Sequence, residues 1–536
     1  MKKKMSLVAL LLVVAMVFTA CGNSSQDSAA ASETAVASDV AATSAVEEAV
    51  VAATDVIPND GVLNVGWTTG VEGFDPASDN NYIGNYLVYE GLFEMNPDTQ
   101  ELDNVLCESY EWVDDCTLKI KLKDNVYFSD GDKLVAEDVL FSMYRYIDLG
   151  SNLSTYYTVY DWDKCVAEDD LNLTLVTYEP YGPGLTNLTR PILNKSWCET
   201  AAEDDWWDKP CGTGPYTVAE NVSGSHTSYT LRDDYWNKDN SSYDFQTMNV
   251  RSYAEASTMF IDFENGAIDV AFGVSVADST RVLNGEVNCG YVVRSNNDVI
   301  NLVFNEACPY FEDIRVRQAI ACAIDREAVG QAAYGDLTIP ATSFVSASMG
   351  KYYENVGAHE YDPEKAKELL AEAGYADGFD IKMVIVNSSA NQALAEGIQF
   401  YLSEVGINMT IEAYAIPTAV PMFMAGEADV VLNQQNGGAY LLEPNQIYDT
   451  STENSTNLCV RCTDPEFNGY LSAGLNSVDE AVRIENYKNA QKWNQENIHT
   501  VPLVEDAGCY VFDGKVQSFN VNSLTYPNLL YVKAAE

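Results

Sequence analysis

Apolar and polar residues alternate with strand-like and helix-like periods from residue 62 onward. Residues 62–67 form a short apolar run that predicts a buried strand opening the fold. In residues 118–122 leucine and isoleucine alternate with lysine, the period of two of a half-buried strand. The residues that then recur at helical spacing, and predict the buried face of a helix, are Ala136, Val139, Leu140, Met143, Tyr144 and Ile147.

A helix over 363–373 has both of its ends marked in the sequence. Asp362 is suited to accept hydrogen bonds from the first main-chain amides, and Pro363 fits the first helical position. Gly374 tolerates the positive φ that ends many helices. Strand, helix and strand patterns follow over 379–386, 394–405 and 407–413. This alternation predicts an α/β lobe with a mostly parallel sheet.

The first residues of the chain indicate export and anchoring. Lys2, Lys3 and Lys4 precede an apolar run over 7–17 that is too short for a comfortable membrane span. Small residues then lead to Cys21, and this arrangement resembles the bacterial lipobox. The resemblance implies a signal peptide over 1–20, acylation with chains such as palmitate at Cys21, and anchoring on the extracytoplasmic face of the cell membrane. An ordinary secretory signal with an incidental cysteine is the alternative.

Residues 21–57 are rich in alanine, serine, threonine and acidic residues and have no lasting helical period. We expect them to form a flexible tether. The formal net charge of the chain is −50, and without the three signal lysines 27 basic residues face 80 acidic ones. Such a charge repels phosphate backbones, so the sequence excludes a nucleic-acid partner.

Cysteine and histidine give no evidence of a cofactor. Besides Cys21 there are eleven cysteines, an odd number, and the short spacings of Cys107/Cys116 and Cys198/Cys211 would permit bridges while leaving the pairing open. Three scattered histidines give little support for a nickel or haem site. We therefore expect neither metal nor cofactor.

Six segments in collinear order resemble the family 5 extracytoplasmic solute-binding proteins of ABC importers, the oligopeptide, dipeptide and nickel group. The segments are Phe74-Asp75-Pro76 with Tyr89 to Phe93, Val126 to Gly131, Ala136 to Val139 with Ser142, Gly212 to Tyr216, Val316 to Ile320 with Ala323 to Arg326, and Ala366 to Tyr375. The likeness extends over residues 62–505.

The resemblance implies an α/β, two-lobed periplasmic-binding-protein-like fold (type II, cluster C) with an extra domain inserted in lobe one. Lobe one would comprise residues 58–97, 208–300 and 500–536, the additional domain 98–207, and lobe two 301–499. It also implies a non-enzymatic monomer that closes around a small solute, most simply an oligopeptide or dipeptide, and delivers it to ABC permease subunits.

Two stretches would line the cleft by the same analogy. The first contains Asn81 and Tyr82, and the second is the amide-rich loop that follows the strand at 429–432. The candidate contacts in that loop are Gln434, Gln435, Asn436, Tyr440 and Glu443. Peptide binders of the family usually place an aspartate where this chain has Tyr440, so the usual partner of the peptide ammonium is missing.

Three alternatives stay open. The amide-rich loop and the supply of tryptophan and tyrosine also suit a neutral oligosaccharide. A secreted hydrolase is a second alternative, although no motif of a serine or zinc hydrolase is present. A peptide sensor that feeds no transporter is the third.

Overall fold

The computed structural model describes residues 49–68, 71, 73–77, 82–96, 99–151, 153–202, 205–305, 307–434, 462–519 and 528–535. The predicted lipidation site Cys21 and the tether up to residue 48 lie outside them. In this described part of the chain, no helix is both long and apolar enough to cross a membrane.

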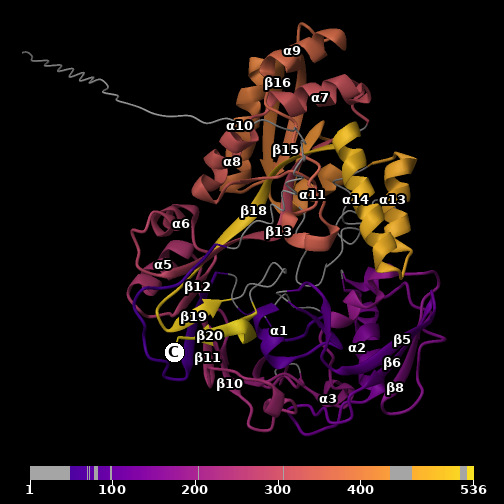
Figure 1. Cartoon of the computed structure of the whole chain (residues 1–536), viewed down its shortest axis with the longest axis vertical. Coiled ribbons are helices and arrows are strands. Elements are labelled where there is room, and N and C mark those ends of the chain that lie inside the picture. The colour runs from indigo at the N-terminus through magenta and orange to yellow at the C-terminus, as the bar shows by residue number, and fades with distance from the viewer. Residues whose placement is uncertain are drawn as a thin grey trace, which may run out of the picture. The chain divides into compact units, whose positions relative to one another are not determined.

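A twelve-stranded mixed sheet organises the fold (Figure 1). In one part of it, β2 lies parallel to both β11 and β12. β10 then pairs antiparallel with β11, and β9 pairs antiparallel with β10. The bounds of these strands are β2 Val62–Trp67, β9 Tyr216–Val222, β10 His226–Leu231, β11 Thr247–Ser252 and β12 Val270–Phe272.

The other part of the sheet has a parallel core. β15 pairs in parallel with both β16 and β17. The bounds are β15 Phe379–Val386, β16 Ile407–Tyr414 and β17 Val430–Gln434. The predicted strand at 379–386 and the predicted parallel pairing are therefore confirmed for these three strands. The sheet as a whole is mixed, because the strands that join its two parts run antiparallel.

Two long strands join the parts, β13 (Gly290–Phe304) and β18 (Thr500–Phe512). Near one end the pair borders β1 (Ala49–Val51) and β12, and near the other it borders β17 and β14 (Ile339–Pro340). The register between β13 and β18 shifts between Ser295 and Val299 and again between Ile300 and Asn301. The strands therefore bend between the two sets of neighbours.

A separate four-stranded sheet has the order β5-β6-β8-β7 and lies with α2 in the purple region of Figure 1. Its elements are β5 Cys107–Asp114, β6 Thr117–Leu122, β7 Val166–Ala167, β8 Asn172–Val176 and α2 Ala136–Asp148. All of them fall within the predicted additional domain, whose exact bounds remain a prediction. The shorter elements nearby are β3 Phe93–Met95, β4 Leu102–Asn104, α3 Lys195–Thr200 and α4 Asp205–Asp208.

Helices cover the large sheet (Figure 1). Those of the first part are α1 Tyr82–Val88, α5 Ala256–Glu264 and α6 Val276–Leu283. Those of the second part are α7 Ile314–Ala323, α8 Arg326–Tyr334, α9 Pro363–Glu372, α10 Ser389–Glu404, α11 Ile416–Ala425, α13 Pro465–Leu475 and α14 Glu480–Asn497. The C-terminal residues add β19 Val516–Phe519, the short helix η8 Leu529–Tyr531 and β20 Val532–Ala534.

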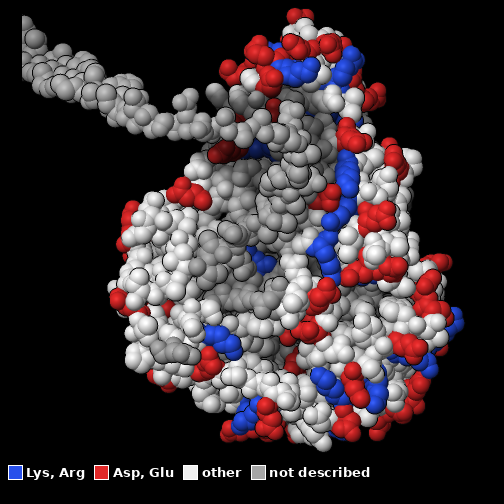
Figure 2. Space-filling model, viewed as in Figure 1, with Lys and Arg blue, Asp and Glu red and all other residues white. Residues whose placement is uncertain are grey.

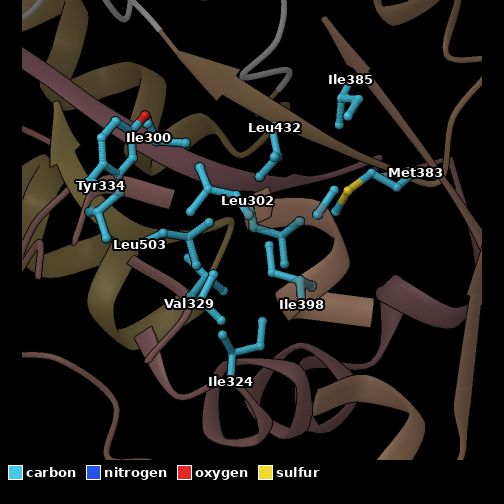
Figure 3. Packing of buried hydrophobic residues seen from close by; sticks show 14 of the residues in the cluster. Ile300, Leu302, Ile324, Val329, Tyr334, Met383, Ile385, Ile398, Leu432 and Leu503 are labelled. Atoms are coloured by element: carbon cyan, nitrogen blue, oxygen red, sulfur yellow. The ribbon is translucent and has the colours of Figure 1, made fainter. Parts of the chain in front are cut away.

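The hydrophobic core differs between the two faces of the sheet. On one face a single cluster extends from Met259 and Phe260 of α5, through β13 and β18, to the helices that pack on β15. Figure 3 shows its central residues, among them Leu302, Leu503 and Met383, converging from different strands and helices. On the other face there are two separate clusters. Along β13, Val292 belongs to the first of these and Val303 to the second.

The helix ends and helix faces expected from the sequence are partly confirmed. Asp362 accepts from the amide of Lys365 at 2.9 Å, and Gly374 has φ +92°, which confirms the predicted ends of α9. The predicted stripe on α2 is wrong at one position, since Tyr144 is 46% exposed and Tyr146 is buried instead. Tyr146 stacks on Tyr157 with ring centroids 4.7 Å apart, a contact that helical spacing alone does not reveal.

Both cysteine pairs whose spacing would permit bridges, Cys107/Cys116 and Cys198/Cys211, are free thiols. Cys107 begins β5, and Cys116 follows the far end of the same strand. An extended strand of this length separates the two residues by far more than the roughly 7 Å that a disulfide allows between Cα atoms. Figure 2 shows Asp and Glu spread over the visible face, as expected for so acidic a chain.

Candidate binding site

The candidate site is the region between the two separate core clusters, which along β13 lies between Val292 and Val303. Along β13 this interval carries the buried polar residues Arg294, Asp298 and Asn301, where an uninterrupted sheet would carry apolar ones. Burying such groups is unfavourable unless they are paired, so their presence indicates a functional or conformational role. The same interval contains the register shifts of β13 and β18.

Asn301 and Asn433 face each other across neighbouring strands. They are direct partners in the antiparallel pairing of β13 and β17. Because side chains alternate along a strand, they lie on the same face as Val303 and Val431, which belong to one cluster. Within the described residues Asn301 Oδ1 accepts no hydrogen bond and Asn433 Nδ2 donates none. A buried acceptor and a buried donor are thus available where the apolar cluster ends.

Glu505 of β18 holds the strand crossing together. Its carboxylate accepts hydrogen bonds from Ser295 Oγ at 2.5 Å, from Ser346 Oγ at 2.6 Å and from the Ala347 amide at 3.1 Å. Ser295 and Ser346 are both buried. Three donors around one buried carboxylate replace the water that it loses. The network joins β13, β18 and the segment that begins the 3-10 helix η7 (Ala347–Tyr352).

The segment that leads toward α1 is anchored to α2. Arg145 Nη2 of α2 donates to Asp75 Oδ2 at 2.6 Å, and the guanidinium lies 4.9 Å from the centre of the Trp206 ring. Burial acts to lower the pKa of Arg145, but the hydrogen bond to Asp75 and the nearby negative charges together outweigh burial, so the pKa of Arg145 is raised. Tyr89 donates to the main-chain oxygen of Phe74 at 2.9 Å. Both ends of the stretch that contains the predicted contact Asn81 are therefore fixed.

Residues from distant parts of the sequence also meet around η7. Gln100 Nε2 donates to the Ser348 carbonyl at 3.0 Å. Lys351 Nζ lies 3.5 Å from Glu101 and 2.7 Å from Glu480. These contacts join the hairpin of β3 and β4 to η7 and α14.

The predicted contacts are only partly covered by the described residues. Tyr82 is the first residue of α1 and Gln434 the last of β17, and only their main chains are described. Asn81, Gln435, Asn436, Tyr440 and Glu443 lie outside the described residues. Sequence reasoning missed Glu505 and Asn301, whereas Asn433 is the first residue of the amide-rich loop that was expected to line the cleft. The signal for Asn301 was one amide within the otherwise apolar stretch 299–304.

Comparison with known proteins agrees with this architecture. Residues 101–457 match the model of the bacterial extracellular solute-binding proteins, family 5 (middle). The chain belongs to this family. The predicted family is therefore confirmed, and the chain is a solute-binding protein and not an enzyme.

Relatives of this family 5 protein are named for different solutes. It is 25% identical to the dipeptide-binding protein of Escherichia coli K12 over an alignment of 460 residues, which covers 78% of this chain and 84% of the relative. It is 22% identical to heme-binding protein A of Haemophilus influenzae, with 83% and 87% of the two chains covered.

The solved structure of Helicobacter pylori DppA with the peptide STSA matches with a TM-score of 0.71 at 22% identity and covers 89% of this chain and 98% of that one. This likeness confirms the predicted α/β, two-lobed fold.

Proposed function

We propose that this family 5 protein captures a short peptide between its lobes and delivers it to an ABC permease. The observation that carries the proposal is the family match together with the crossing of β13 and β18. Both strands have one set of neighbours on each side of the register shifts, so bending there moves the two parts of the sheet relative to each other. Ligand binding would select the closed arrangement.

The peptide class is supported by relatives named as dipeptide-binding and glutathione-binding proteins. In the proposed cleft, Asn81, Tyr82, Gln434, Gln435, Asn436, Tyr440 and Glu443 supply side-chain contacts. Amide side chains both donate and accept, which suits a peptide main chain. Asn301 and Asn433, with their buried and unused polar atoms, would contact the ligand at the base of the cleft.

Tyr440 bears on which peptides bind. A tyrosine hydroxyl can accept a hydrogen bond from an ammonium but supplies no compensating charge. We therefore propose that recognition rests on the main-chain amides of the peptide, with Glu443 as the nearest candidate for its N-terminal ammonium. Acetylation of the peptide N-terminus tests this role of Glu443. It should weaken binding strongly if Glu443 pairs with the ammonium, and only slightly if it does not.

The experiment is a thermal-shift screen of the mature protein against dipeptides to hexapeptides, matched with neutral oligosaccharides. A peptide present at 100 times its Kd should raise the free energy of unfolding by about 2.7 kcal/mol. A shift with oligosaccharides and none with peptides would overturn the peptide class while leaving solute capture intact. Peptide hydrolysis during the assay would contradict the whole proposal.

We also propose that Cys21 carries the lipid anchor and that the folded body is a monomer. The support is the basic, apolar and small-residue pattern before Cys21. Cys21→Ala should move the protein from the membrane fraction to the soluble exported fraction and abolish labelling with radioactive palmitate. Unchanged membrane association in that variant would refute the anchor. Light scattering of the soluble form tests the monomer.

A further inference from the structure

A cavity of about 210 Å³ lies apart from the strand crossing. Its walls come from α1, β3, the end of β4, the segment 235–243 and the segment around η8. None of these lining residues belongs to β13, β17 or β18. The cavity is therefore separate from the strand crossing, although α1, whose first residue Tyr82 is a proposed cleft contact, forms part of its wall.

The lining of this cavity includes two carboxylates and four asparagine amides, which are Glu90, Glu94, Asn85, Asn104, Asn237 and Asn528. Glu90 accepts from the Tyr235 hydroxyl at 2.6 Å and from Trp236 Nε1 at 2.8 Å. Glu94 accepts from Asn528 Nδ2 at 3.1 Å. An ionised carboxylate offers about four acceptor positions, so both keep capacity for a further donor.

Asn85 gives an independent indication of a ligand. Its side chain is 2% exposed and lines the cavity from α1. Among the described residues its Oδ1 has no hydrogen-bond donor. A buried acceptor without a donor is costly, and a ligand that donates to it would remove the cost. At Asn85, therefore, a donor is what is missing.

The charges of the lining residues also favour a ligand that donates hydrogen bonds. Lys123 is the one basic side chain among the lining residues. Its Nζ already donates to the Asn104 carbonyl at 3.2 Å and lies 5.4 Å from the centre of the Trp236 ring. Burial lowers the pKa of Lys123 from its usual value. Two carboxylates against one engaged lysine favour a cation and disfavour an anion.

The rest of the wall selects an organic cation over a metal ion. Phe93, Met95 and Leu530 are apolar, and Tyr235 and Tyr243 present aromatic rings. Rings of this kind attract ammonium groups. In the part of the chain that the structure describes, no group of three or more His, Cys, Asp or Glu is placed to hold a metal.

We propose that this cavity, through Asn85, Glu90 and Glu94, binds a small primary ammonium with a short apolar body. Three N–H donors of the ammonium match three acceptors, one each from α1, the segment that follows it and β3. The alkyl portion occupies the apolar wall. The site lies apart from the strand crossing and is suited to a free amine or to the amine of a short side chain.

Protonation of Glu94 competes with the cation. Burial raises the pKa of Glu94 to about 7, opposed by hydrogen bonds from Tyr531 and Asn528 and increased by the charges of Glu90 and Asp103. Burial likewise raises the pKa of Glu90, opposed by hydrogen bonds from Tyr235 and Trp236 and by the charge of Arg232. Tyr243 lies near both carboxylates. Since the ammonium binds the ionised form, its affinity should rise about ten-fold between pH 6 and pH 8.

Isothermal titration of the mature protein with n-butylamine tests the proposal, with n-butanol and butyrate as neutral and anionic controls of similar shape. Saturable binding of the amine alone is expected, tightening between pH 6 and pH 8. Binding of butanol or butyrate with similar affinity, or no saturable binding of the amine at pH 8, would overturn it. This series needs no variant.

Variants locate the site. Glu94→Gln and Asn85→Leu should each weaken butylamine binding about ten-fold or more, because each removes one acceptor. Glu108→Gln changes an exposed carboxylate paired with Lys121 and should bind as the wild type does. Tyr440→Ala should also leave amine binding unchanged. Loss of amine binding in Tyr440→Ala would place the amine in the cleft and refute the second site.

Discussion

Ser295 Oγ donates a hydrogen bond to the carboxylate of Glu505 at 2.5 Å, and this bond joins β13 to β18 where both strands change neighbours. The same carboxylate accepts from Ser346 at the start of η7. A buried carboxylate that gathers three donors at a bend fixes the geometry of that bend. We interpret the Glu505 network as the support of the hinge.

Glu505→Ala should lower the free energy of unfolding by about 2–4 kcal/mol, because it leaves two buried hydroxyls and one amide without their acceptor. Glu505→Gln keeps a carbonyl acceptor and should cost less. Urea denaturation measures both. The control is Glu111→Ala, an exposed position on β5 where a change within about 0.5 kcal/mol is expected. Equal losses for Glu505→Ala and the control would contradict the interpretation.

Asp513 should make stability depend on pH in an unusual direction. Burial, with the nearby charge of Asp269, raises the pKa of Asp513 to about 6, against the opposing effect of Lys515. The folded state then holds this proton more tightly than the unfolded state. The contribution is favourable in acid and is lost as the pH rises from about 4 to about 6.

The corresponding variant is Asp513→Asn, whose side-chain oxygen can still accept from the Lys515 amide. It should be more stable than the wild type by about 1–2 kcal/mol at pH 7.5 and equal to it near pH 4. Asp60→Asn is a control of opposite sign. A hydrogen bond from the Val62 amide and the charge of Lys515 lower the pKa of Asp60, so this variant should be less stable at pH 7.5. Calorimetric Tm values at both pH values distinguish these outcomes.

Two glycines of α13 form a matched pair. A Cβ on Gly474 would come within 2.2 Å of the Tyr487 ring of α14, whereas a Cβ on Gly469 would meet nothing within 4 Å. Gly474→Ala should therefore destabilise the protein by about 1–3 kcal/mol through overpacking. Gly469→Ala should stabilise it by about 0.5–1 kcal/mol through helix propensity. Urea denaturation measures both variants. If both substitutions changed the free energy of unfolding in the same direction, the close contact between α13 and α14 at Gly474 would be contradicted.

The sequence predicted those helices and strands whose ends or hydrophobic periodicity are determined by residues close together in the chain. The cap at Asp362 and the strand at 379–386 are examples. Tyr144 shows the limit of this reasoning, since it has the same helical spacing as its buried neighbours and still faces solvent. The packing of α2 depends on Tyr157, which lies outside the helix.

The candidate sites depend still more on distant segments. Asn301 and Asn433 are 132 positions apart and become partners only through the register of β13 and β17. Glu94 meets Asn528 across most of the chain, so nothing near residue 94 in the sequence marks it as buried. Motifs thus identified the family, while the polar groups that could serve ligands emerged only from strand pairing and cavity walls.

Tyr440 is the residue of the predicted loop whose removal is most informative. If its ring packs on the bound peptide, Tyr440→Ala should raise the peptide Kd roughly ten-fold and leave the Tm of the unliganded protein unchanged. The matched control is Tyr178→Ala, because that side chain is 64% exposed and belongs to the predicted additional domain. Tyr440→Phe separates the ring from the hydroxyl, since affinity close to the wild type would assign the contact to stacking. If Tyr440→Ala binds peptide as tightly as Tyr178→Ala does, Tyr440 does not belong to the site, and the analogy that placed the loop in the cleft fails at this residue.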